Sequence, residues 1–139
     1  MLSTLYQNDL KKKRNRRRNR SAALVCCPQK EGSVLKPRIV TPKKPNSARR
    51  PVAKAKLTNK KFVVAHIPGT GHNLRKHSTI LVRGGGCRDL PGVRHTCIRG
   101  VSDFLGVRDK TKRRSIYGIK RPPEMAKRVR RKFRAIFGQ

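Results

Sequence analysis

The centre of the chain is a series of short apolar runs that Gly, Pro and Asn residues keep interrupting, and this pattern constrains the fold most. Between residues 52 and 58, apolar side chains fall at every second position, which is the period of a half-buried strand. Further apolar runs predict strands over residues 36–40, 62–65 and 79–82, and around residues 97–101. No long helical pattern separates them. The sequence therefore predicts an all-β fold in which five short strands form a small closed barrel.

Residues 41–49 (TPKKPNSAR) predict a stiff loop between the first two strands. Pro42 and Pro45 each fix their own φ angle and push the preceding residue toward extended geometry, so the segment cannot form a helix. The loop gathers two cations, an amide and a hydroxyl, which belong to Lys43, Lys44, Asn46 and Ser47. Lysines can hold phosphates, and small polar side chains can reach sugars or base edges. A plain solvated turn is the alternative interpretation of such a loop.

The charge of the chain argues against that alternative. It contains 38 Lys and Arg residues but only 6 Asp and Glu residues, which gives a formal net charge of +32. Such a charge opposes compaction unless a polyanion neutralises it. No run approaches the roughly 20 apolar residues of a membrane span. The polyanions that remain as candidate partners are nucleic acid and an acidic lipid surface.

The positive charge is concentrated near both ends of the chain. Residues 11–20 (KKKRNRRRNR) hold eight basic residues, and residues 120–134 hold eight more. Blocks of like charge are typical of arms that lie along phosphates. The arm residues are Lys11, Lys12, Lys13, Arg14, Arg16, Arg17, Arg18 and Arg20.

The expected organisation therefore has three parts. A basic N-terminal extension covers residues 1–35, the barrel covers residues 36–106, and a basic tail covers residues 107–139. A short helix is predicted over about residues 123–137, because a Pro-Pro-Glu start precedes apolar residues at helical spacing.

The cysteines and histidines do not form a recognisable metal motif. Cys26 and Cys27 are adjacent while Cys87 and Cys97 lie far away, so the C-x-x-C spacing of zinc sites is missing. A zinc site completed by histidines such as His66 and His95 is the alternative. Four separate thiols in a reducing compartment are the favoured interpretation.

No pattern of catalytic residues stands out either. The six acids are scattered and offer no carboxylate pair, so we expect Asp89 to orient its loop rather than to act in catalysis. His72 and His77 have no nucleophile at a recognisable spacing. We therefore expect no enzymatic activity and no cofactor apart from Mg²⁺ shared with RNA.

Seven motifs occur in a fixed order along the chain: CPQK at residues 27–30, TPKKPNSA at 41–48, LTN at 57–59, GHNL at 71–74, VRGG at 82–85, DLPGVR at 89–94 and YGIKRP at 117–122. With these motifs, residues 23–121 resemble the universal small-subunit ribosomal proteins of the S-twelve family, which lie at the decoding centre. The resemblance implies an OB-fold barrel whose N-terminal extension threads through ribosomal RNA. It also implies that two loops of the barrel face the codon–anticodon minihelix.

The family's functional positions can be carried over to this sequence by motif. The residues implied to contact rRNA at the decoding centre are Lys43, Lys44, Pro45, Asn46, Ser47, Arg88, Asp89, Pro91 and Arg94. Of these, Lys43 and Arg88 stand at family positions beside the aminoglycoside site. His72 and Asn73 match a loop that faces tRNA and elongation factors. The roles agree with physical chemistry, because small donors such as Ser47 can read the shape and 2′-hydroxyls of an A-form minor groove.

The resemblance also implies the partners. These are small-subunit rRNA, neighbouring ribosomal proteins, tRNA and mRNA at the decoding centre and, transiently, elongation factors. The basic tail could instead coat a membrane, but next to a ribosomal core we expect rRNA or a protein as its partner and no membrane. A free-standing RNA-binding or RNA-chaperone barrel is the alternative function. Sedimentation with small subunits would distinguish the two.

Departures from the family pattern bear on the second strand and on the compartment. Arg49 replaces an aliphatic residue and Pro51 a basic one, so we expect the second strand to start late. His95 stands where tyrosine is common, and the chain continues past Pro122. The N-terminus is family-like and lacks the features of a presequence, which suggests a protein made where it works, in a bacterium or in an organelle with its own genome. The departures and the extra tail then favour a mitochondrial ribosome, with a plastid or the bacterial cytoplasm as alternatives.

Overall fold

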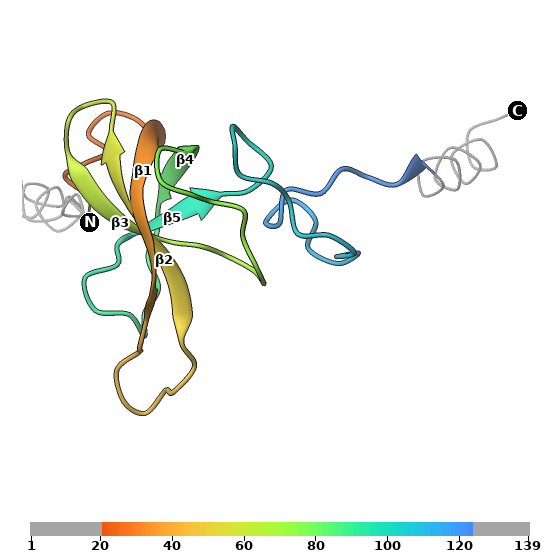
Figure 1. The fold of residues 1–139 in the computed structure, drawn as a ribbon, viewed down its shortest axis with the longest axis horizontal. Coiled ribbons are helices and arrows are strands. Elements are labelled where there is room, and N and C mark those ends of the chain that lie inside the picture. Colours follow the sequence, from red (N-terminus) through yellow and green to blue (C-terminus); the bar gives the residue numbers. More distant parts are fainter. Residues whose placement is uncertain (1–20, 124–139) are drawn as a thin grey trace, which may run out of the picture.

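The computed structural model describes residues 21–123, and these form a closed barrel of five strands (Figure 1). The strands are β1 (Gln29–Val40), β2 (Arg50–Leu57), β3 (Phe62–His66), β4 (Thr79–Gly84) and β5 (His95–Ile98). Their order around the barrel is β1-β2-β3-β5-β4, and every neighbouring pair is antiparallel except β3 and β5. The predicted all-β barrel is confirmed. The arm of residues 11–20 lies outside the described residues, as does all but the first residue of the helix expected over 123–137.

The long strand β1 closes the barrel by pairing along its length with two different strands. Its first half pairs with β4, and Gly32 lies where the pairing with β2 begins, opposite both Leu57 and Ile80. A Cβ atom at Gly32 would lie 2.7 Å from the backbone oxygen of Lys56, so a side chain cannot fit where three strands meet. An irregularity between Val34 and Lys36 then shifts the register with β2. Such a bulge bends a strand, and here it lets β1 turn the corner of the barrel.

Two expectations about strand ends are wrong. The first strand begins at Gln29 rather than at residue 36. Residues 29–35 gave no strand signal because they are mostly polar, and only Gly32 and Val34 among them are buried. The second strand does not start late. Pro51 lies within β2 and its oxygen accepts a hydrogen bond from Ile67 N at 3.1 Å. The N and O of one strand residue point to the same side, so the missing N–H of Pro51 removes no bond to β1.

Alternation along the strands places one apolar set inside the barrel. Ala53, Ala55 and Leu57 of β2 are almost fully buried, as are Ile80 and Val82 of β4. A second, smaller apolar cluster consists of Val52, Leu90 and Val93, with Val40, Val64 and Cys87 packed against it. Because Val52 and Val64 have the opposite parity to the inward residues of β2 and β3, this cluster lies on the outside of the barrel. It forms where the loop after β4 folds back over the sheet.

Residues 21–24, shortly before β1, are held on the barrel by packing and hydrogen bonds. Ala23 and Leu24 belong to the main core, and the Ala23 oxygen accepts a hydrogen bond from Asn59 Nδ2 at 2.9 Å. Lys61 Nζ donates to the Ala22 oxygen at 2.8 Å. The side chains of Ser21 and His95 also form a hydrogen bond, at 2.6 Å. Ser21 therefore lies beside the start of β5.

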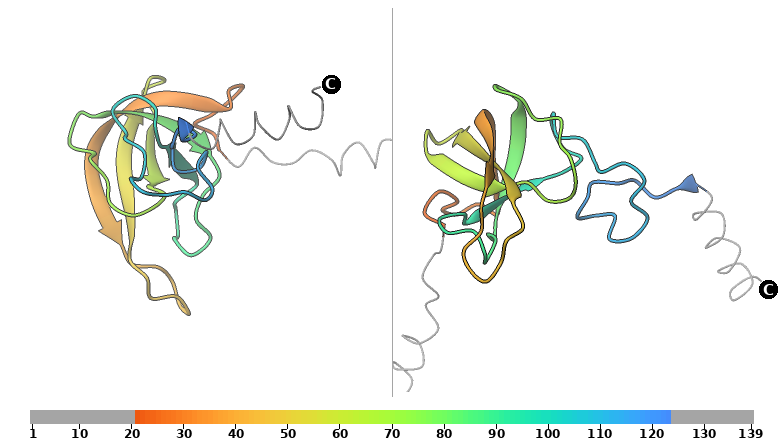
Figure 2. Two further views of the ribbon diagram at one scale, coloured as in Figure 1. Left: turned by 90° about the vertical axis from the view of Figure 1, so that its right-hand side faces the viewer. Right: turned by 60° about the horizontal axis from the view of Figure 1, so that its bottom comes forward.

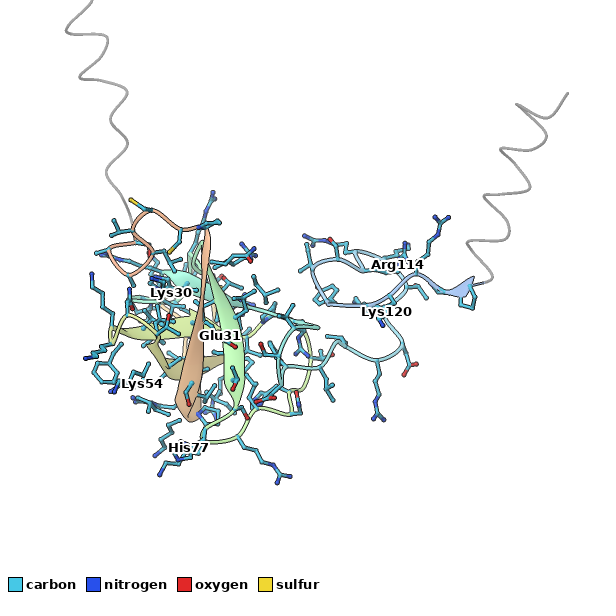
Figure 3. The ribbon with its side chains drawn as sticks, turned by 90° about the horizontal axis from the view of Figure 1, so that it is seen from above. Lys30, Glu31, Lys54, His77, Arg114 and Lys120 are labelled. Carbon is cyan, nitrogen blue, oxygen red and sulfur yellow. The ribbon has the colours of Figure 1, made fainter. Side chains whose placement is uncertain are left out.

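The segment after β5 extends to one side of the barrel (Figure 2). It includes a separate bridge between Val101 and Phe104, so Val101, expected in the last strand region, lies outside the barrel sheet. Arg114 and Lys120 lie on the part of this segment that leads away from the barrel (Figure 3). Within residues 21–123, no helix is long and apolar enough to cross a membrane.

Candidate nucleic-acid interface

Two loops form the candidate interface, and they are joined to each other. The first loop covers residues 41–49 between β1 and β2, and the second covers residues 85–94 between β4 and β5. The backbone N–H of Lys43 donates to the oxygen of Asp89 at 3.0 Å, which links the loops directly. Pro42 is buried, and Leu90 and Val93 pack on Val52 in the outer apolar cluster. The base of each loop therefore rests on the barrel.

Asp89 is the centre of this junction. Its side chain is 8% exposed, and Oδ2 accepts a hydrogen bond from Nε of Arg50 at 2.6 Å in an ion pair. The other carboxylate oxygen, Oδ1, accepts one from Cys87 Sγ at 2.8 Å. The two carboxylate oxygens therefore bind one residue from the start of β2 and one from the second loop. The expectation that Asp89 orients its loop agrees with this geometry.

Three groups at the junction have shifted pKa values. Hydrogen bonds from Cys87 and then from Arg50 lower the pKa of Asp89 below its ordinary value. The hydrogen bond to Asp89 raises the pKa of Arg50. Burial, followed by the hydrogen bond to Asp89, raises the pKa of the Cys87 thiol. At neutral pH the junction therefore holds a carboxylate, a guanidinium and a protonated thiol.

Acid is expected to weaken this junction. Because the folded state lowers the pKa of Asp89, its contribution to stability is present above the ordinary aspartate pKa of about 3.9. It is lost as the pH falls through the lower pKa of the folded state. Asp89→Asn should therefore be less stable than the parent at neutral pH, and the gap should close below about pH 4. Chemical unfolding followed by circular dichroism at a series of pH values measures this.

Asp109→Asn is the matched control, because Asp109 is exposed and Asn, like Asp, tolerates its positive φ of 59°. This control should change little at any pH. A stability gap for Asp89→Asn that stays constant from neutral pH into acid would contradict the role of the Asp89 carboxylate.

The other residues that the resemblance implies at the decoding centre are exposed. The exposed members are Lys43, Lys44, Pro45, Asn46, Ser47, Arg88, Pro91 and Arg94. A hydrogen bond of 3.1 Å from Asn46 N to the Lys43 oxygen turns the first loop tightly at its tip. The acid between the two loops is already paired, so the exposed cations give this surface a net positive charge. Among the decoding-centre residues predicted from the sequence, Asp89 is buried and bonded to Arg50 and Cys87, and the others are exposed.

A third loop, residues 67–78 between β3 and β4, carries His72 and Asn73, and the two residues differ in their surroundings. Asn73 Nδ2 donates to the Asp103 oxygen at 2.7 Å, and Asn73 Oδ1 accepts from Leu105 N at 3.2 Å. Its amide therefore fastens the loop to the segment after β5. The side chain of His72 is exposed and stays available for contact.

Arg99 holds this third loop in place through hydrogen bonds, a role that the sequence did not predict. It is 4% exposed, and its guanidinium donates to the oxygens of Pro68, Gly71 and Leu105. The guanidinium also lies over the ring of Phe104, 4.4 Å from its centroid. Burial lowers the pKa of Arg99. The roles of Arg50 and Cys87 were not predicted either. A single arginine or cysteine in such a basic sequence does not indicate which residue it will contact.

The thiols stay separate within the described part of the chain. Cys26, Cys27, Cys87 and Cys97 are free, and burial raises the pKa of Cys97 to about 12. Among residues 21–123, no group of three or more His, Cys, Asp or Glu side chains could hold a metal ion.

A comparison with known families supports the resemblance drawn from the motifs. The family model described as ribosomal protein S12/S23 matches residues 17–123. The match includes both joined loops, the His72 loop and all five strands.

Proposed function

Because the chain belongs to the ribosomal protein S12/S23 family, we propose that its two joined loops bind rRNA at the decoding centre and influence the accuracy of tRNA selection. The family is structural and non-enzymatic, and its members are constituents of the ribosomal small subunit. The chain's place is therefore the ribosome, with rRNA and other ribosomal proteins as its partners.

The observation that carries the decoding proposal is the junction at Asp89. It holds two loops from different parts of the sequence in one fixed arrangement, through Arg50, Cys87 and the backbone of Lys43. Lysines and arginines on this surface can neutralise phosphates, which positions the protein on RNA. Asn46 and Ser47 then present small polar groups at the tip, suited to 2′-hydroxyls in a shallow minor groove. Preorganised loops lose little conformational freedom on binding, so small differences in RNA geometry can affect the contact.

Ser47→Ala is expected to change decoding accuracy more than subunit assembly. The variant removes one exposed hydroxyl, and a hydrogen bond contributes about 0.5–1.5 kcal/mol. Because about 1.4 kcal/mol corresponds to a factor of ten, near-cognate misreading should change by about twofold to tenfold. In vitro translation on subunits reconstituted with each variant measures this. Ser115→Ala, which removes an exposed serine from the segment after β5, is the control and should translate like the parent. Parental misreading by normally assembled Ser47→Ala subunits would exclude this role for the loop tip.

The His72 loop is proposed to face tRNA and elongation factors. Asn73 and Arg99 fasten this loop from below, and His72 is exposed at its outer side. The basic residues of the arm are proposed to lie along rRNA phosphates, in keeping with the eight positive charges in residues 11–20. Mg²⁺ bound by rRNA would share the neutralisation of those phosphates.

We also propose that the ribosome is mitochondrial. This proposal is supported by the resemblance drawn from the motifs, which implies that Arg49, Pro51 and His95 stand where the family commonly has other residues. The sequence also continues beyond residue 123, where the family match ends. The proposal is tested by separating mitochondrial from other ribosomes of the source cells and identifying peptides of this chain by mass spectrometry. Peptides confined to non-mitochondrial small subunits would overturn the compartment and leave the decoding proposal intact.

A further inference from the structure

The outer face of β2 and β3 has two halves with different surroundings. Val52 and Val64 lie under the second loop, in the outer apolar cluster with Leu90 and Val93. Toward the β2–β3 turn, the same face is uncovered and carries Lys54, Lys56 and Phe62, all exposed. In Figure 3, Lys54 projects from the outside of the barrel. One half of the face is therefore closed by the protein itself, and the other half is open.

Phe62 is unusual within the open half. It is one of only four phenylalanines in the chain, yet its side chain is 62% exposed. The strand register places Lys56 directly opposite Phe62 and places Lys54 two residues further along β2, on the same face. Neighbours at these two positions lie within about 8 Å, in reach of long side chains. The aromatic ring is thus bordered by two lysines.

A hollow of about 310 Å³ adjoins this ring, and its lining includes Lys54, Phe62 and Arg94. The remaining wall is made of Ser21–Ala23, the neighbouring residues of β3, Gly92 and His95. None of the acids in the described part of the chain contributes to it. The hollow therefore combines an aromatic surface with cations on two sides.

We propose that this site binds an unpaired nucleotide of RNA, with the base stacked on Phe62 and the flanking phosphates held by Lys54 and Arg94. Single-stranded RNA is recognised in this way, since every base has a flat face and each stacked base contributes to affinity. The β2–β3 face is also the oligonucleotide-binding face of OB-fold barrels in general. A protein partner with an apolar side chain would fit the ring but leave the surrounding lysines unmatched. The inference rests on the proposed rRNA binding and extends it to a second site, beside the decoding loops.

The absence of tryptophan from the sequence allows a direct test. Phe62→Trp places a single indole in the full chain at the proposed site while keeping an aromatic surface. Its fluorescence should be quenched by a single-stranded RNA oligonucleotide, because the base stacks on the indole. An abasic oligonucleotide of the same length and an RNA duplex should bind without comparable quenching. Fluorescence anisotropy of the labelled nucleic acids reports binding separately.

Leu105→Trp is the matched control, because Leu105 is 60% exposed and lies outside this hollow. Its emission should change little with the same single strand. As a second variant, Phe62→Leu keeps an apolar side chain without the ring. It should bind the single strand about fivefold or more weakly and bind the duplex with parental affinity.

Two results would overturn the inference. If the single strand binds by anisotropy but quenches Phe62→Trp no more than Leu105→Trp, the stacking site is wrong and the proposed rRNA binding stands. The same holds if Phe62→Leu weakens single strand and duplex equally. If none of the proteins, the parent included, binds any of the RNAs, the rRNA-binding proposal itself fails.

Discussion

Arg99→Leu is expected to lower the free energy of unfolding by about 2–4 kcal/mol, the largest stability effect that we anticipate. The substitution removes the donors that serve the oxygens of Pro68, Gly71 and Leu105, and it removes the cation from the Phe104 ring. Hydrogen bonds to charged groups contribute about 1.5–3 kcal/mol each. Relief from burying the guanidinium offsets part of the loss. Thermal and chemical unfolding of the full chain, followed by circular dichroism, measures the effect.

Two comparisons separate this role from a general effect of removing positive charge. Arg108→Leu removes an exposed arginine near the same loop and should leave stability within about 0.5 kcal/mol of the parent. Arg99→Lys keeps the charge but cannot serve three acceptors with one planar group, so its stability should lie between parent and Arg99→Leu. Equal unfolding curves for Arg99→Leu and Arg108→Leu would show that the hydrogen bonds of Arg99 contribute little.

Gly86→Ala is expected to displace the second loop of the interface, with a cost of about 1–3 kcal/mol in overpacking. A Cβ atom at this position would lie 2.0 Å from the backbone oxygen of Val93 and 2.8 Å from the Cα of Arg94. Both contacts are to backbone, just beyond the last pair between β4 and β5, so no side-chain rotation can relieve them. The loop as a whole has to move, and Asp89 moves with it. We therefore expect poor incorporation into subunits or strongly altered misreading in those that form.

Gly84→Ala is a close control in the same run of three glycines. The nearest atom to a Cβ at Gly84 is Leu24 Cδ1 at 3.9 Å, which is ordinary van der Waals contact, and Gly84 does not have a positive φ. This variant should assemble and decode like the parent. Reconstitution of small subunits, followed by sedimentation and a misreading assay, compares the two. Normal assembly and accuracy with Gly86→Ala would contradict the prediction, because the second loop would then function despite the displaced backbone at its base.

The barrel was predictable because most of its strands have apolar patterns that are local in the sequence. Alternation in β2 and the apolar runs of β3 and β4 are signals within a few residues of each other. The start of β1 was missed for the opposite reason, since its inward positions are Gly32 and Val34 between polar residues. The start of β1 pairs with β4, and from Gly32 on the strand pairs with β2, so it can be stabilised by its partners rather than by its own apolar content.

The candidate site was predictable in part. The exposed loop residues followed from motifs, because their chemistry is local to each loop. The pairing of Asp89 with Arg50 joins residues 39 positions apart, and the contacts of Arg99 extend up to 31 positions. Charge in a chain of +32 carries almost no information about which arginine is buried. The topology of the barrel, which brings β2 beside the second loop, identifies Arg50 as the partner of Asp89.

The pairing of β1 with β4 has a consequence for how the protein is made. Gln29 pairs with Arg83, and β4 in turn pairs with β5, which ends at Ile98. Synthesis proceeds from the N-terminus at about 5–20 residues per second. The barrel therefore cannot close until the chain has been extended beyond Ile98, several seconds after β1 emerges. During this interval β1 and β2 expose a hydrophobic face and an unpaired edge. Non-local closure of this kind slows folding, so capture of the nascent chain by RNA or a chaperone would compete with aggregation before the last strand arrives.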